Sequence, residues 1–220
     1  MQNIWNAIKL DFFSARSSLL IAVAMLVIAS VISVVVGQPI IVIIYVMMFS
    51  TFLSGMVFSV DEKNNLHKLF GILPLRRTDW VAARYLYATV MGFCLFALAV
   101  ALYPIISMLA GVDLDSLMLF TFIGVAFLYY CFAVGVIYPI YIRFSFSKAY
   151  IFTMIPLALI GVGVMIVARK ADLSWSFLNE TMQFFTENQV LILVFSILVG
   201  LILMTVSAGI ASIFYRHKEL

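Results

Sequence analysis

Few residues in this chain have side chains suited to catalysis or to metal binding. The 220 residues include two cysteines, Cys94 and Cys131, and two histidines, His67 and His217. Both cysteines lie in apolar segments, and neither histidine has further metal-ligating residues at a suitable spacing. Cysteine in such segments is commonly a small buried apolar residue. The pattern therefore indicates no disulfide framework and no metal site.

The familiar catalytic and nucleotide-binding motifs are also absent from the sequence. There is no GxxxxGK[ST] phosphate-binding loop, no GxSxG nucleophile elbow and no HExxH zinc motif. We therefore predict that the chain is not an enzyme and has no catalytic residue, metal or cofactor of its own. Any work driven by ATP would need a separate chain that binds the nucleotide.

The most distinctive charged stretch is residues 61–80, DEKNNLHKLFGILPLRRTDW. It contains four apolar residues at positions i, i+3, i+4 and i+7, which form one face of a helix: Leu66, Leu69, Phe70 and Leu73. Asp61 and Glu62 favour the N-terminal end of such a helix, and Pro74 ends it. We expect a short amphipathic helix over 61–74. It would lie on lipid headgroups or dock into a groove of a partner protein, and periodicity alone favours neither.

The elements around this stretch are apolar. Hydrophobic residues make up 65% of the chain and charged residues only 10%, against about 25% in a typical soluble domain. A membrane-spanning helix needs about 20 apolar residues. Gly37-Gln38-Pro39 divides the first apolar run into two helices by a turn. We predict an all-α polytopic membrane protein, one domain over 1–220, with six spans at about 18–36, 40–60, 82–109, 117–141, 149–168 and 190–215.

The positive charges predict the orientation of these spans. With both termini on one side, eleven Lys and Arg residues fall on that side, and only Arg169 and Lys170 fall on the other. The positive-inside rule then places both termini in the cytoplasm. The interiors of the predicted spans lack ionisable residues, which argues against a proton-driven transporter.

Two further short helices are expected outside the spans. Residues 1–16 carry Ile4, Trp5, Ile8, Phe12 and Phe13 on one face, which indicates an interfacial helix or a plain extension of the first span. Between spans five and six, apolar residues at 175, 178, 182 and 185 indicate a short helix in the outer leaflet.

Residues 58–86, FSVDEKNNLHKLFGILPLRRTDWVAARYL, carry a family resemblance in three places: Asp61-Glu62-Lys63, Leu73 to Arg77, and Arg84-Tyr85-Leu86. This stretch resembles the signature of the ABC-2 type permeases of bacterial ABC transporters, particularly the small six-span kind. Arg84 stands where the family often has lysine. Residues 138–149 resemble the family's loop between spans four and five, with Ser145 in place of glycine, and residues 212–220 resemble its ending. The similarity extends over the whole chain.

The resemblance implies a machine of several chains in a bacterial cell membrane. Two permease subunits, identical or related, would pair in the bilayer above two separate ATPase subunits that bind the ATP. The segment 61–74 would be the coupling helix that contacts the ATPase. Its implied contact residues are Glu62, Lys63, Leu66, Lys68, Leu69, Phe70, Leu73 and Pro74. The outer helix would help to close the exit, with Trp175, Leu178 and Phe185 as gate residues, or would serve only as an interfacial anchor.

The leading functional hypothesis is an exporter permease for amphipathic or antimicrobial peptides, lipid-like compounds or drugs. Short outer loops leave no room for an external binding domain, which fits export. The alternative is a non-transporting scaffold or sensor subunit of a peptide-resistance complex. The fourth span is dense in aromatic residues that would either line a path for cargo or pack and face lipid: Phe120, Phe122, Phe127, Tyr129, Tyr130, Phe132, Tyr138 and Tyr141.

Overall fold

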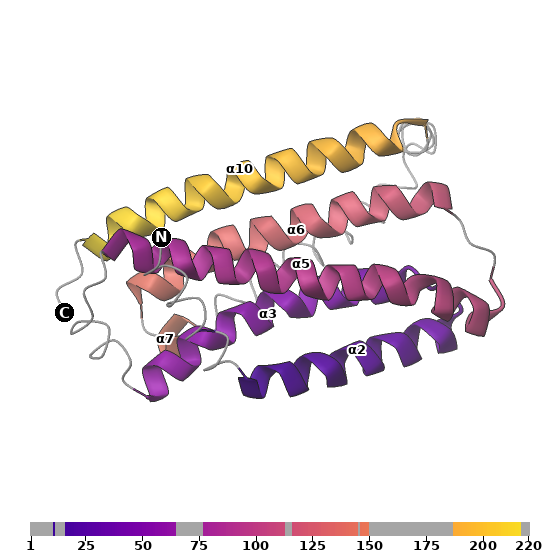
Figure 1. Ribbon diagram of the computed structural model, residues 1–220, viewed down its shortest axis with the longest axis horizontal. Helices are drawn as coiled ribbons and strands as arrows, with labels where there is room; N and C mark the ends of the chain where they lie inside the picture. Colours follow the sequence, from indigo (N-terminus) through magenta and orange to yellow (C-terminus); the bar gives the residue numbers. More distant parts are fainter. Residues whose placement is uncertain are drawn as a thin grey trace, which may run out of the picture.

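The computed structural model describes residues 11, 16–64, 77–112, 116–144, 146–149 and 187–216. Across these residues the regular structure is helical. The helices are α2 (Arg16–Val36), α3 (Ile41–Lys63), α5 (Arg77–Ala110), α6 (Ser116–Arg143), α7 (Phe146–Ala149) and α10 (Gln189–Arg216) (Figure 1). The predicted all-α class is therefore confirmed for the described part of the chain.

Four helices are long and apolar enough to cross a membrane, namely Ile41–Lys63, Thr78–Ala110, Leu119–Arg143 and Gln189–Tyr215. The apolar part of α2, Leu20–Val36, is a shorter helix. The predicted span at 149–168 lies outside the described residues. A multi-pass membrane protein is thus established, and the count of six spans stays a prediction.

The turn between α2 and α3 forms where Gly37-Gln38-Pro39 predicts it. Gly37 has a φ of 72°, a left-handed conformation that glycine adopts without steric cost. Its N–H donates to Val34 O at 3.1 Å, and the N–H of Gln38 donates to Ser33 O at 3.1 Å. These two bonds satisfy the last carbonyls of α2 and reverse the chain, so that α3 packs on α2.

Two helices extend beyond the predicted ends of their spans. α3 continues to Lys63, so Asp61, Glu62 and Lys63 form its last turn instead of beginning a separate helix. α5 begins at Arg77, before the predicted start at 82. Its 34 residues are about 50 Å long at 1.5 Å per residue, which exceeds a hydrocarbon core of about 30 Å. The charged start of α5 therefore extends out of the membrane core.

The helices form a bundle, and most of the charged residues that the structure describes lie at one end of it. The end of α3, the start of α5, the ends of α6 and α10, and α7 all lie at the left of Figure 1. Lys63, Arg84, Arg143 and Lys148 belong to these segments. We call this end of the bundle the charged end. The turn between α2 and α3 and the end of α5 lie at the opposite end.

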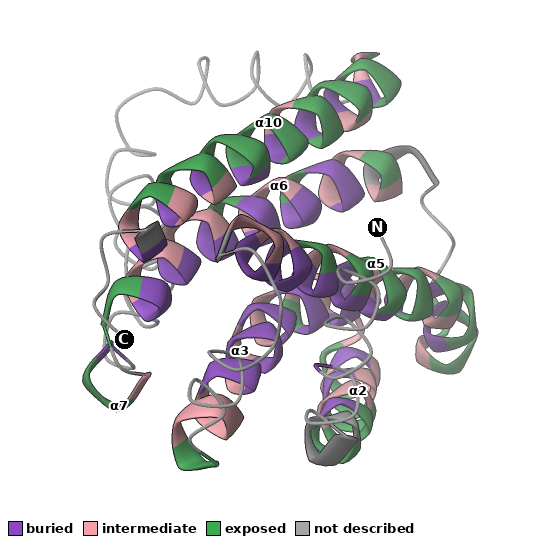
Figure 2. Cartoon of the chain, turned by 60° about the vertical axis from the view of Figure 1, so that its left-hand side comes forward, coloured by how far each residue is buried: buried purple, intermediate pink, exposed green. Residues whose placement is uncertain are grey.

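The packed core is centred on α3, which contacts α2, α5 and α6. Val42, Ile43, Met47 and Val57 of α3 are fully buried. α10 lies at the edge beside α6, and many of its residues are exposed, as the green parts of its ribbon in Figure 2 show. The large exposed residues of α10 are apolar. Such residues suit contact with lipid because the bilayer interior is itself apolar.

The expectation that both cysteines are buried is confirmed for one of them. Cys131 of α6 is fully buried, whereas Cys94 of α5 is exposed. The expectation of burial was wrong for Cys94 because an apolar exposed face has no penalty inside a bilayer, so an apolar sequence does not distinguish lipid contact from core.

Candidate functional site at the charged end of the bundle

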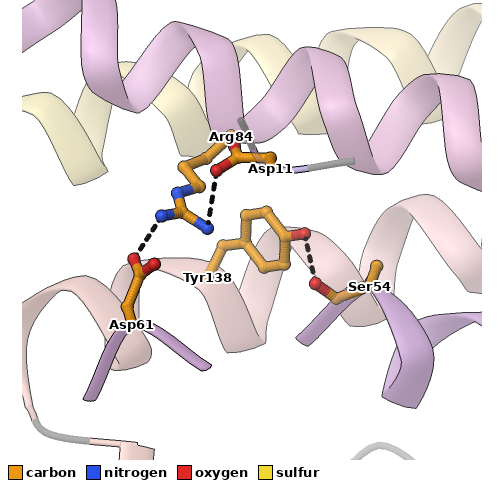
Figure 3. Close-up of polar contacts among 5 residues, drawn as sticks. All are labelled: Asp11, Ser54, Asp61, Arg84 and Tyr138. Atoms are coloured by element: carbon orange, nitrogen blue, oxygen red, sulfur yellow. Dashed lines mark hydrogen bonds and ion pairs between the residues drawn. The ribbon is translucent and has the colours of Figure 1, made fainter. Parts of the chain in front are cut away.

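The candidate site is a buried cluster of three charged residues, which we call the Arg84 cluster. Arg84 of α5 is fully buried and makes ion pairs with Asp11 and Asp61 (Figure 3). Its Nη1 lies 3.3 Å from Asp11 Oδ1, and its Nη2 donates to Asp61 Oδ2. Three parts of the chain therefore meet at one guanidinium: the N-terminal segment, the end of α3 and the start of α5.

The geometry of the α3–α5 pair explains why Arg84 faces Asp61. The two helices pack against each other in opposite directions, so the last turn of α3 lies beside the first turns of α5. A guanidinium presents its donors in a planar fork and can hold two carboxylates at once. Lysine, a single point charge, would not offer this geometry.

Aromatic rings surround the same guanidinium. The Cζ of Arg84 lies 5.2 Å from the ring centroid of Phe58 and 4.9 Å from that of Trp80. A cation so placed is attracted by the ring quadrupole. Trp80 stacks in turn on Tyr215 of α10, with ring centroids 4.7 Å apart. The end of α10 is thereby connected to the cluster.

The electrostatics of the Arg84 cluster are unbalanced when both acids are ionised. Two carboxylates then share one buried cation, and a buried charge is costly unless it is paired. Burial raises the pKa of Asp11 from 3.8 to about 6; the Arg84 charge lowers this pKa and the Asp61 charge raises it again. Binding one proton at Asp11 makes the cluster neutral.

A second polar contact fixes the end of α3. The N–H of Ser147 donates to Glu62 Oε2 at 3.0 Å, and the Ser147 hydroxyl donates to Glu62 Oε1 at 2.6 Å. The last turn of α3 is thus attached to α7, the short helix that follows α6. An open hollow of about 350 Å³ lies beside this contact, lined by Ser59, Glu62, Lys63, Phe146 and Ser147.

Hydrogen bonds between helices continue from the charged end into the bundle. The Ser207 hydroxyl of α10 donates to Gly135 O of α6 at 2.6 Å, so the Tyr85 hydroxyl must donate to Ser207 Oγ, also at 2.6 Å. Two tyrosines of α6 donate to backbone carbonyls: Tyr130 to Ala88 O at 2.6 Å and Tyr138 to Ser54 O at 3.0 Å. These bonds connect α3, α5, α6 and α10.

The eight aromatic residues of the fourth predicted span differ in burial, and two of them, Phe122 and Tyr129, are half-buried. Phe127, Tyr130, Tyr138 and Tyr141 are buried, which confirms the packing interpretation for these four. Phe120 and Phe132 are exposed. Phe58 of α3 contacts the ring of Tyr138 at 5.0 Å between centroids, so the buried rings form part of the core between α3 and α6.

The structure describes few of the predicted contact residues. Glu62 is half-buried and bonded to Ser147, and Lys63 is exposed at the end of α3. The other predicted coupling and gate residues lie outside the described residues: Leu66, Lys68, Leu69, Phe70, Leu73, Pro74, Trp175, Leu178 and Phe185. So does the apolar face of the N-terminal helix. Within the described part of the chain, no three His, Cys, Asp or Glu residues are grouped to hold a metal ion.

Sequence reasoning missed the Arg84 cluster. Arg84 borders a charge-free run, and the sequence marks it as a charge that orients the protein and as part of the family resemblance, with no sign of its acidic partners. Asp11 is the only acidic residue before the first span and stands between the apolar residues Leu10 and Phe12, and that isolation was the available signal.

The family comparison decides the identity of the chain. Residues 6–216 match the family described as ABC-2 family transporter protein. The chain belongs to this family. The resemblance in the sequence is thereby confirmed, and the chain is a membrane transport subunit without a catalytic domain. ABC-2 permeases pair with ABC ATPase subunits. Neither the curated proteins nor the solved structures include a match to this chain.

Proposed function

We propose that the chain is the permease of an ATP-driven exporter and that a separate ABC ATPase docks on the segment that begins in the last turn of α3. The observation that carries the proposal is the anchoring of this turn. Asp61 is bound to Arg84 of α5, and Glu62 is bound to Ser147 of α7. A force that the ATPase exerts on the residues after Lys63 would therefore be transmitted through these two contacts to α5 and α7.

The docking residues in this proposal are the apolar face and its charged rim. Leu66, Leu69, Phe70 and Leu73 would fill a groove of the ATPase, because an amphipathic helix docks through residues at this spacing. Lys63 and Lys68 would form ion pairs at the rim, where such pairs contribute orientation more than affinity. Glu62 would combine a rim role with its bond to Ser147.

The direction of the helices supports a single six-span domain over 1–220. α6 and α10 lie side by side, and both end at the charged end (Figure 1). The chain between them has to return to the opposite end, and the apolar run 149–168 is long enough for that crossing. We place the charged end, with both termini, in the cytoplasm of a bacterial cell because positive charge accumulates there.

Export of an amphipathic peptide or a hydrophobic compound follows in this proposal from the apolar character of the subunit. A second copy or a related permease would complete the path through the membrane. Trp175, Leu178 and Phe185 would close its outer exit.

The test is purification of the tagged chain from its own host in mild detergent, followed by mass spectrometry of its partners. The variant L69D/F70D places charges on the proposed docking face. N64D adds one charge beside that face and serves as the matched control. We expect a P-loop ATPase with the native chain and with N64D, and its loss with L69D/F70D. If no ATPase accompanies the native chain, the exporter proposal is wrong and the scaffold or sensor alternative takes its place.

A further inference from the structure

The Arg84 cluster joins two residues that lie far apart in the sequence, Asp11 and Asp61. Asp11 precedes the first predicted span, and Asp61 stands two residues before the end of α3 at Lys63. The side chains of Arg84, Asp11 and Asp61 are 0%, 5% and 13% exposed. Figure 3 shows the guanidinium between the two carboxylates.

We propose that Arg84 is a positioning residue for transport, which holds the N-terminal segment against the last turn of α3 so that both move when the ATPase displaces the segment after α3. The proposal rests on the proposed function, because it assigns a mechanical partner to the docking segment. It goes beyond that function because it gives the N-terminal segment a part in each transport cycle.

The position of Arg84 suits this role better than a purely structural one. A guanidinium that only neutralised Asp61 would need one carboxylate, yet Arg84 also pairs with Asp11 from a different part of the chain. Trp80 lies over the same guanidinium and stacks on Tyr215, so a shift of Arg84 also reaches α10. The cluster therefore connects the N-terminal segment, α3, α5 and α10 at the charged end.

Asp11 is the releasable partner in this arrangement. Its contact with Arg84 is an ion pair at 3.3 Å, whereas Asp61 accepts a hydrogen bond from the same group. The groups that act on Asp11 are Arg84 and Tyr87 from α5 and Asp61 from α3. Because burial raises the pKa of Asp11 to about 6, its docked state is favoured when the carboxyl is protonated. This stabilisation is complete below pH 3.8, the ordinary value, and is lost as pH rises through about 6.

The first experiment tests the cluster in the chain alone. A spin label is attached at Lys9→Cys in a chain that also carries Cys94→Ser and Cys131→Ala, and its mobility is recorded in nanodiscs from pH 5 to 8. We expect the mobile fraction to rise as the pH rises through about 6, because the contribution of the bound proton to docking is lost there. In Asp11→Asn the label should stay immobile at every pH, because the amide is neutral. An unchanged pH dependence in Asp11→Asn would overturn the proposal.

Substitutions of Arg84 test its charge and its geometry. Arg84→Gln should raise the ratio of mobile to immobile label at pH 7 by about tenfold, since breaking a buried pair leaves uncompensated charge. Arg84→Lys keeps the charge but lacks the planar fork, so it should restore only part of the immobile fraction. Arg143→Gln removes an exposed positive charge at the same end and should leave the label as in the native chain. A label equally immobile in Arg84→Gln and the native chain would also overturn the proposal.

The second experiment uses the complex with the ATPase that co-purifies with the native chain. ATP hydrolysis stimulated by the permease is compared in the native, Arg84→Gln and Arg84→Lys complexes, with gel filtration to exclude misfolded protein. We expect Arg84→Gln to keep the ATPase bound but to reduce the stimulated kcat about tenfold, and Arg84→Lys to recover part of the loss because it restores the charge without the fork. Full stimulation in Arg84→Gln would contradict the positioning role. Absence of any bound ATPase would contradict the proposed function instead. The spin-label experiment would still test whether Arg84 holds the N-terminal segment.

Discussion

Gly92 of α5 offers the most quantitative test of how closely the helices pack. A Cβ added at Gly92 would lie 2.3 Å from Cε1, 2.5 Å from Cζ and 2.8 Å from the hydroxyl oxygen of Tyr130. Tyr130 is only 1% exposed, so its ring has little room to move aside. Displacing the ring would also break the 2.6 Å hydrogen bond from its hydroxyl to Ala88 O. Gly92→Ala should therefore destabilise the bundle.

The expected loss of unfolding free energy in Gly92→Ala is the sum of three contributions. Forcing a methyl group into a packed core costs about 1–3 kcal/mol. The lost hydrogen bond between helices adds about 0.6 kcal/mol. Alanine offsets about 0.5–1 kcal/mol because it is a better helix former than glycine. The net loss is about 2 kcal/mol, which corresponds to a fall in Tm of about 6 °C for a protein of this size.

The buried thiol of Cys131 provides the assay. In a Cys94→Ser background, a thiol-reactive fluorophore in detergent should label Cys131 only as the bundle unfolds. Gly209→Ala is the matched control, because an added Cβ there meets nothing within 4 Å. Its Tm should be unchanged or slightly raised. Tyr130→Leu added to Gly92→Ala should cost less than the two changes separately, since it removes the clashing ring. A Gly92→Ala variant as stable as Gly209→Ala would refute the close contact of α5 and α6.

Three further predictions concern the polar contacts and the orientation. Ser207→Ala should destabilise the bundle by about 1 kcal/mol, measured by the same fluorophore, because it removes both an acceptor and a donor between helices. Lys63→Cys in the Cys94→Ser background should react with an impermeant maleimide only in inverted vesicles, and Val112→Cys only in intact cells; the reverse would contradict the orientation. Glu62→Gln should weaken the attachment of α7 and speed tryptic cleavage after Lys148, whereas an unchanged cleavage rate would mean that α7 is held by other contacts.

The sequence predicted those features that depend on local composition. The apolar runs identified the five helices that the structure describes at predicted spans, because a bilayer requires long apolar segments whatever their neighbours. The turn at Gly37 was predictable because glycine alone combines readily with a positive φ at a helix end. The buried rings of the fourth span were left as two alternatives, since an aromatic residue suits the core and the lipid surface equally well.

The features that depend on several distant segments were not predictable. Arg84 is buried among Asp11, Asp61 and the rings of Phe58 and Trp80, which come from separate parts of the chain. No short sequence pattern indicates that they lie together. The extension of α3 to Lys63 depends in part on Ser147, which holds Glu62 from another helix. The count of Lys and Arg residues assigns Arg84 to the cytoplasmic side. It does not indicate that Arg84 binds Asp11 and Asp61.

The central claim is that an ATPase contacts the segment after α3. Its most direct test is photocrosslinking in the native host with benzoylphenylalanine placed at Leu69, and with the same group at exposed Val112 at the opposite end of the bundle as control. Our account predicts an adduct between position 69 and a P-loop ATPase, and none from position 112. Crosslinks from position 69 to lipid alone, with the transporter fully assembled, would contradict it.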